Sequence, residues 1–231
     1  MVTKVGVVIP VLNQFKMAID CIASIDYDED IHVEVVPNYR LGLPLSAAWN
    51  IGAQACFDKG CHYVLIVNDD ILLNMHTIGN MVKFFRETEC VLVTAHNMRG
   101  LIEPDAILNT VFDEDASFYE APDFSCFMIT ESTLTKVGLF DASFTPAYFE
   151  DNDYHRRIIL GGYKAFKCMN AKFYHYGSQT QNSVSNGIVT SPMFDKNRNH
   201  YVEKWGGVPG EEKFEHPYND RNLSFKQVRL P

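Results

Sequence analysis

Residues 63–70 of this 231-residue chain read YVLIVNDD, a short apolar run followed at once by an amide and two carboxylates. A β-branched run of this length is typical of a strand buried on both faces, as in a parallel sheet. In open α/β folds, ligands bind beyond the carboxyl ends of such strands. Asn68, Asp69 and Asp70 are therefore predicted to lie at a ligand-binding edge, although the triplet alone also fits an ordinary turn.

Strand-like and helix-like segments alternate around this triplet. The apolar runs read as further strands at residues 5–11, 31–36 and 90–95. Segments with helical periodicity cover residues 15–24, 47–58 and 74–87. This β-α-β-α-β-α-β order predicts an α/β fold with a doubly wound, mostly parallel sheet and helices on both faces.

The second half of the chain is less regular. Residues 98–122 are rich in acidic and turn residues, and we expect them to flank an active site. Further strands are predicted at 124–129, 164–169 and 172–176, and further helices at 132–137 and 152–160. Residues 177–187 are rich in Ser, Gln, Asn and Gly and are expected to form a mobile lid over a phosphate site.

The chain shows neither an internal repeat nor a linker, so we predict a single domain, 1–231. Its nucleotide-binding half covers about 1–97, its acceptor and catalytic half about 98–205, and a C-terminal tail 206–231.

Composition and charge narrow the function. The formal net charge is -9, which disfavours nucleic acid and anionic lipid as partners. The six cysteines are scattered without a CxxC pair and read as buried, reduced thiols. No apolar stretch reaches the roughly 18–20 residues that span a bilayer, and no signal-peptide pattern opens the chain. A cytoplasmic location is expected, and a homo-oligomer is left open.

Asp70 and His175 are the candidate metal ligands. Hard divalent cations bound through carboxylates neutralise a diphosphate well, which points to Asp70, while Asn68 or Asp69 would hold a ribose or a metal-bound water. A lone histidine is more often structural than a ligand. His175, however, stands between two tyrosines at the end of a predicted strand and suits a manganese-type ion.

Residues 148–153, YFEDND, crowd three carboxylates at a predicted helix start. One interpretation is helix capping with a favourable dipole interaction. The other is a general base, because clustered like charges beside aromatic rings raise a carboxyl pKa. Both hold if Asn152 or Asp153 caps the helix while Asp151 faces an acceptor. Trp205 reads either as core packing or as the floor of a sugar site.

Taken in order, these motifs resemble the inverting GT-A-fold glycosyltransferases of family 2. Residues 7–13, VVIPVLN, resemble the family's first strand and nucleotide-contacting turn, and residues 41–52, LGLPLSAAWNIG, are similar to its Asn-x-Gly…Ala-x-Asn-x-Gly segment. The Asn-x-Asp form of residues 68–70 looks like that of the rhamnosyltransferase-like branch. Residues 137–141, residues 148–153 and His175 resemble the signature G-x-F-D…E-D-x-D…R…G…H.

The resemblance implies transfer of a sugar from a nucleotide-diphosphate sugar to an acceptor hydroxyl with inversion, assisted by Mn²⁺ or Mg²⁺. It makes Asp151 the catalytic base and Asp70 with His175 the metal ligands. The acceptor or sugar would contact Glu150, Asp153 and Trp205. The nucleotide would contact Pro10, Val11, Asn13, Asn38, Asn50, Asn68 and Asp69. The second strand lacks the family's terminal Asp that reads the base, and Asn38 is expected to replace it.

Other functions compete with this prediction. A nucleotidyltransferase shares the acidic metal site but releases pyrophosphate rather than a nucleoside diphosphate. A degenerate member would bind a nucleotide sugar or glycan without turnover. The expected partners are a nucleotide-sugar donor and a glycan or another hydroxyl acceptor; a DNA acceptor is disfavoured by the negative charge.

Overall fold

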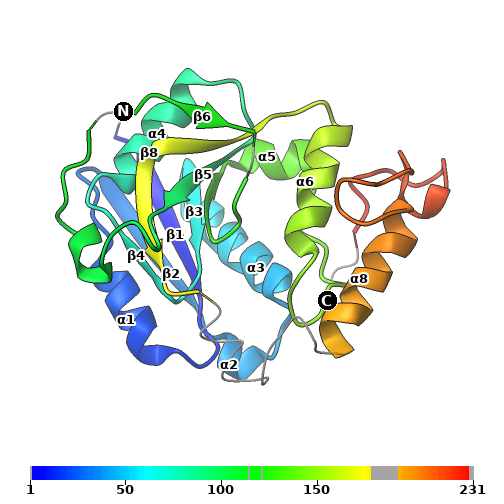
Figure 1. The fold of residues 1–231 in the computed structure, drawn as a ribbon, viewed down its shortest axis with the longest axis horizontal. Coiled ribbons are helices and arrows are strands. Elements are labelled where there is room, and N and C mark those ends of the chain that lie inside the picture. Colours follow the sequence, from blue (N-terminus) through cyan, green and yellow to red (C-terminus); the bar gives the residue numbers. More distant parts are fainter. Residues whose placement is uncertain (1, 114, 121, 178–191, 229–231) are drawn as a thin grey trace.

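A computed structural model of the chain describes residues 2–113, 115–120, 122–177 and 192–228 (Figure 1). Within these ranges one mixed sheet has the strand order β2-β1-β3-β7-β5-β8-β4, with β6 paired to β8. The strands are β1 Lys4–Pro10, β2 Asp30–Val36, β3 Tyr63–Val67, β4 Ile71–Leu73, β5 Leu92–Asn97, β6 Phe118–Tyr119, β7 Cys126–Ile129 and β8 Ala165–His175. β2, β1, β3, β5 and β8 run in one direction, whereas β7, β4 and β6 run against them.

Helices cover both faces of this sheet (Figure 1). They are α1 Phe15–Ala23, α2 Asn38–Leu41, α3 Leu45–Asp58, α4 Thr77–Glu87, α5 Glu131–Val137, α6 Glu150–Leu160 and α8 Pro192–Trp205, with 3-10 turns η1 Pro104–Ile107 and η2 Pro217–Asn219. Because side chains alternate along a strand, Val7 joins the core beneath α1 and α4, and Val8 joins the core beneath α3 and α6. The predicted fold class, mostly parallel with helices on both faces, is confirmed.

Several elements differ from the sequence prediction. β7 inserts antiparallel between β3 and β5, which the regular β-α-β order did not anticipate. The two strands predicted at 164–169 and 172–176 are one strand, β8, with an irregular register opposite β5. β4 was missed because it has only three residues. The segment 98–122 carries η1 and β6, and the predicted lid falls, apart from Gly177, outside the described residues.

α8 forms a further layer outside α6, away from the sheet (Figure 1). It has its own small core, made by Phe144, Phe149, Tyr201 and Trp205, all of them buried. Burial of large aromatic side chains is a strong local source of stability. Among the described helices, none is long and apolar enough to cross a membrane.

Candidate active site

The Asn68–Asp69–Asp70 triplet joins β3 to a distant part of the sheet. The chain leaves β3 at Val67 and re-enters as β4, whose Ile71 pairs with His175 at the end of β8. The backbone N–H of Tyr176 donates to the Asp70 carbonyl over 3.1 Å. The triplet, which was predicted to lie at the edge of the sheet, thereby lies beside the end of β8.

Asp70 and His175 lie in direct contact, although 105 residues separate them. His175 Nε2 is 2.9 Å from Asp70 Oδ1, and Asp70 is only 4% exposed. Their meeting follows from the pairing of β4 with β8. The structure thus brings together the two residues predicted to bind a metal ion.

Asp70 and His175 fit a site in which the protein supplies some of the metal ligands and the substrate supplies the others. Across residues 2–113, 115–120, 122–177 and 192–228, no group of three or more His, Cys, Asp or Glu side chains is arranged to hold a metal by itself. Mg²⁺, however, usually keeps several waters and binds through one or two carboxylates plus substrate phosphates. Asp70 can supply such a carboxylate, and a neutral imidazole such as that of His175 is a common ligand of transition-metal ions.

Asn97 and Arg99 extend the site beyond the predicted residues. Asn97 Oδ1 accepts from the backbone N–H of His175 over 3.3 Å and from that of Arg99 over 3.0 Å. The Arg99 guanidinium packs so closely on Gly177 that a Cβ there would lie 1.9 Å from Nη1. The positive charge of Arg99 therefore lies beside Gly177, which follows His175 by two residues. Residues 98–122 were expected to flank the site, but nothing in the sequence singled out Arg99.

Asp123 links the triplet to the predicted base and was also missed. The backbone N–H of Asn68 donates to the Ser125 carbonyl, and that of Ser125 donates to Asp123 Oδ1, each over 3.0 Å. The negative charge of Asp123 contributes to a raised pKa of Asp151. The available signal was the Asp-x-Ser spacing before a strand, which is a frequent side-chain turn.

Asp151 stands in the first turn of α6, directly after an unusual backbone. Tyr148 and Phe149 have positive φ values of 81° and 71°, which side chains other than glycine rarely adopt. Burial raises the pKa of Asp151, opposed by the backbone N–H groups of Asn152 and of Asp151 itself. A carboxylate of raised pKa is a stronger proton acceptor than that of an ordinary aspartate.

Glu150 is buried beside this carboxyl. It is 4% exposed, and burial, followed by the charge of Asp151, raises its pKa well above the ordinary value. Its Oε2 has no hydrogen-bond partner among the described residues. Burial therefore favours the protonated form of Glu150 more than it does for an exposed glutamate. The predicted contact of Glu150 with a sugar stays a prediction.

The capping prediction for Asn152 and Asp153 is wrong. α6 begins at Glu150, and its N-cap, Phe149, makes no side-chain cap bond. The first-turn N–H of Asn152 donates to Asp151 Oδ1 over 2.8 Å. Asp151 and Asp153 instead lie within the first turn, where carboxylates interact favourably with the helix dipole.

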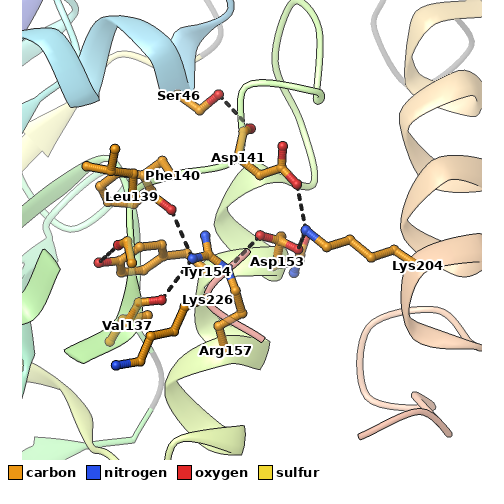
Figure 2. A network of polar contacts seen from close by, with 12 residues as sticks. Ser46, Val137, Leu139, Phe140, Asp141, Asp153, Tyr154, Arg157, Lys204 and Lys226 are labelled. Atoms are coloured by element: carbon orange, nitrogen blue, oxygen red, sulfur yellow. Dashed lines mark hydrogen bonds and ion pairs between the residues drawn. The ribbon is translucent and has the colours of Figure 1, made fainter. Parts of the chain in front are cut away.

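Asp153 and Trp205 do not face an acceptor, which corrects the prediction made for both. Each is fully buried, and the Trp205 indole N–H donates to Asp153 Oδ1 over 2.9 Å. Lys204 Nζ lies 2.7 Å from the same oxygen and 2.6 Å from Asp141 Oδ2, and Arg157 Nε is 2.9 Å from Asp153 Oδ2. Figure 2 shows the contacts of Asp141, Asp153, Arg157 and Lys204 within this network. These residues hold the two helices together.

Two predicted nucleotide ligands have amides that bond to the backbone of the chain itself. The Asn38 amide closes its own loop, accepting from the Leu43 N–H over 2.9 Å and donating to the Leu43 carbonyl over 3.0 Å. The Asn50 amide makes the same two-way contact with the backbone of Phe140, over 2.9 Å and 2.8 Å. Both side chains are buried and serve the fold, since a buried amide needs such partners.

The remaining predicted nucleotide ligands share one edge of the sheet. β1 and β3 are adjacent parallel strands, so Pro10 and Val11 lie at the same edge as Asn68 and Asp69. Asn13 follows in the loop that leads into α1. Their contact with a nucleotide stays a prediction.

Comparison with known proteins supports the fold. No protein-family model matches this sequence. The chain is 27% identical over 124 residues to a galactofuranosyl glycosyltransferase of Leishmania donovani, a match that covers 50% of this chain and 29% of that protein. The chain therefore matches less than a third of the relative's length.

Two solved structures share the architecture. GalNAc-T7 with UDP, GalNAc and Mn²⁺ matches with a TM-score of 0.62 at 13% identity, covering 89% of this chain and 49% of that one. A mutant Drosophila β1,4-galactosyltransferase 7 with manganese, UDP-Gal and xylobiose matches with a TM-score of 0.56 at 12% identity, covering 85% and 80%. At such identities the likeness concerns the fold alone. This chain has the mixed, mostly parallel α/β fold of the GT-A glycosyltransferases.

Proposed function

We propose that this chain is a metal-assisted glycosyltransferase that moves a sugar from a nucleotide-diphosphate sugar to an acceptor hydroxyl with inversion, as in family 2 and its rhamnosyltransferase-like branch. The contact between Asp70 and His175 at the end of β8 carries the proposal. The fold and the matched stretch of a galactofuranosyl glycosyltransferase support it. Of the two solved structures with this fold, one holds UDP, GalNAc and Mn²⁺, and the other holds manganese, UDP-Gal and xylobiose.

The proposed mechanism is a single displacement. The acceptor hydroxyl oxygen attacks the anomeric carbon, the bond from that carbon to the diphosphate oxygen breaks, and Asp151 takes the hydroxyl proton. Asp70 and His175 would hold a divalent ion, which, when bound, neutralises the charge of the leaving diphosphate. Arg99 adds a cation at the same edge of the site. Burial, with a smaller contribution from the charge of Asp123, raises the pKa of Asp151, so its carboxylate is a stronger base.

A thermal-shift screen tests the donor site directly. Nucleoside diphosphates and nucleotide sugars are each added with and without manganese. A ligand that binds only the folded chain at one hundred times its dissociation constant adds about 2.7 kcal/mol to stability. We expect one nucleotide to raise the melting temperature, and manganese to be required for the full rise. No shift with any nucleotide would contradict the proposal, and release of pyrophosphate in a turnover assay would assign a nucleotidyltransferase.

Replacing Asp70 should remove the metal-dependent part of this shift. In Asp70→Asn the carboxylate charge is lost while the side-chain shape is kept, and His175 retains its neighbour. Loss of one metal ligand of two should weaken the manganese-dependent binding of the nucleotide at least about tenfold. The matched control, Asp28→Asn, changes an exposed carboxylate and should behave like the unchanged protein. An unaltered manganese response in Asp70→Asn would place the ion elsewhere.

A further inference from the structure

The turn just before Asp151, residues 147–149, is contacted from outside by α8. Tyr148 and Phe149 both adopt left-handed backbone conformations, with φ values of 81° and 71°, immediately before α6 starts. Such conformations persist only where the surroundings enforce them, and they concentrate at functional sites. The contacts that enforce this turn are therefore of interest for the placement of Asp151.

Asn197 of α8 makes the polar contacts to this turn. Its side-chain nitrogen donates to the Ala147 carbonyl over 2.8 Å and to the Tyr148 carbonyl over 3.3 Å. The side chain is 1% exposed, so water does not replace these bonds. One buried amide thus fixes two successive carbonyls, which determines the direction in which the chain enters α6.

The same face of α8 packs on the turn with aromatic rings. Phe194 lies edge-on to Tyr148 at 5.4 Å and tilted to Phe149 at 5.1 Å between ring centroids, and Tyr201 lies 5.7 Å from Phe149. Positions 194, 197 and 201 recur at helical spacing, so they form one stripe along α8. This stripe faces the turn rather than the central sheet, because α8 lies beyond α6 (Figure 1).

The stripe continues into the buried ion network at the end of α8. Lys204 contacts Asp153, which lies two residues after Asp151 on α6 (Figure 2). Trp205 contacts the same carboxylate through its indole N–H. α8 therefore contacts the chain on both sides of Asp151. Helix and turn together form a clamp, defined here as Asn197, Phe194 and Tyr201 of α8 against residues 147–149.

We propose that Asn197 is a positioning residue for Asp151: its amide holds the turn at residues 147–149 and thereby sets the position of the base. This inference rests on the proposed function, because it assigns Asn197 a part in the same transfer reaction. Asn197 acts through the backbone of the turn and touches no substrate.

The test compares Asn197→Ala and Asn197→Asp with Asn199→Ala, an exposed asparagine on the same helix. Misplacement of a catalytic group by about 1 Å costs roughly 100-fold in rate, so we expect kcat to fall about 10- to 100-fold in both Asn197 variants. The KM for the donor and nucleotide binding should stay within about twofold, since neither depends on a catalytic base. Equal losses in kcat and in nucleotide binding, or an unchanged kcat, would overturn the proposal.

A pH profile separates positioning from general loss of structure. Burial raises the pKa of Asp151, and a loosened turn admits water to its carboxyl. On the acid side of the plot of kcat against pH, the fall in kcat should therefore move to lower pH in the Asn197 variants. It should stay in place in Asn199→Ala. An acid limb that does not move in the Asn197 variants would assign Asn197 to folding alone.

Amide hydrogen exchange keeps the clamp testable if the unchanged protein transfers no sugar. The Asp153 N–H donates to the Phe149 carbonyl over 2.9 Å and reports on the start of α6. Faster exchange at residues 147–153 alone, in the Asn197 variants, would support the clamp even where the proposed function has failed. Exchange that is unchanged, or that rises equally throughout the chain, would overturn it.

Discussion

Asp151→Asn should lower kcat by about 100- to 10,000-fold, the usual contribution of a general base, while the binding of donor and manganese stays nearly intact. The substitution keeps the size of the side chain and its place in the first turn of α6, but an amide cannot take the hydroxyl proton. The two predicted metal ligands belong to β8 and to the link before β4, so the change leaves the donor site untouched. Single-turnover rates with titrated donor measure both quantities.

The pH dependence of this reaction follows from the same carboxyl. Because burial raises the pKa of Asp151, the active carboxylate is lost on acidification at a higher pH than for an ordinary aspartate. The unchanged protein should therefore lose kcat as pH falls through this raised pKa, and Asp151→Asn should lose that limb. Asp58→Asn, at the exposed end of α3, is the control. If binding and turnover fell together in Asp151→Asn, the residue would be structural.

The second large effect concerns stability. Lys204→Met should lower the free energy of unfolding by about 3–5 kcal/mol, because removing one partner leaves buried charges uncompensated. Lys204 is 1% exposed and contacts both Asp141 and Asp153. In chains of this size 1 kcal/mol shifts the melting temperature by roughly 2–4 °C, so a fall of about 6–20 °C is expected. Calorimetry or urea unfolding measures it.

Two further variants define the origin of this loss. Lys196→Met changes an exposed lysine on the same helix and should stay within about 0.5 kcal/mol of the unchanged protein. Lys204→Met combined with Asp141→Asn removes both charges of one pair and should recover part of the stability. A melting temperature of Lys204→Met equal to that of Lys196→Met would show that the buried contacts contribute nothing net.

Much of the fold could be predicted because local patterns specify it. The apolar runs predicted β1 and β3, and the helical periodicity predicted α1, each with bounds within a few residues of those observed. The pairing of strands was not accessible in this way. β7 looks like any short apolar strand, and only the assembled sheet shows that it lies between β3 and β5 and runs against them.

The candidate site divides in the same manner. Asp70, Asp151 and His175 were predicted from their places after a strand, at a helix start and at a strand end, and the family signature names the same residues. Asn50 and Asp153 were assigned to ligands because amides and carboxylates in such motifs often bind them. Their actual partners, Phe140 and Trp205, lie 90 and 52 residues away, which no local pattern encodes.

The central position of β7 has a consequence for how the chain is made. Synthesis proceeds from the N-terminus, so β3 and β5 emerge well before residues 126–129 exist. Until β7 arrives, both of these strands have an open inner edge, and exposed strand edges favour association with other chains. The middle of the sheet is therefore completed only when a strand from the second half of the chain has been made.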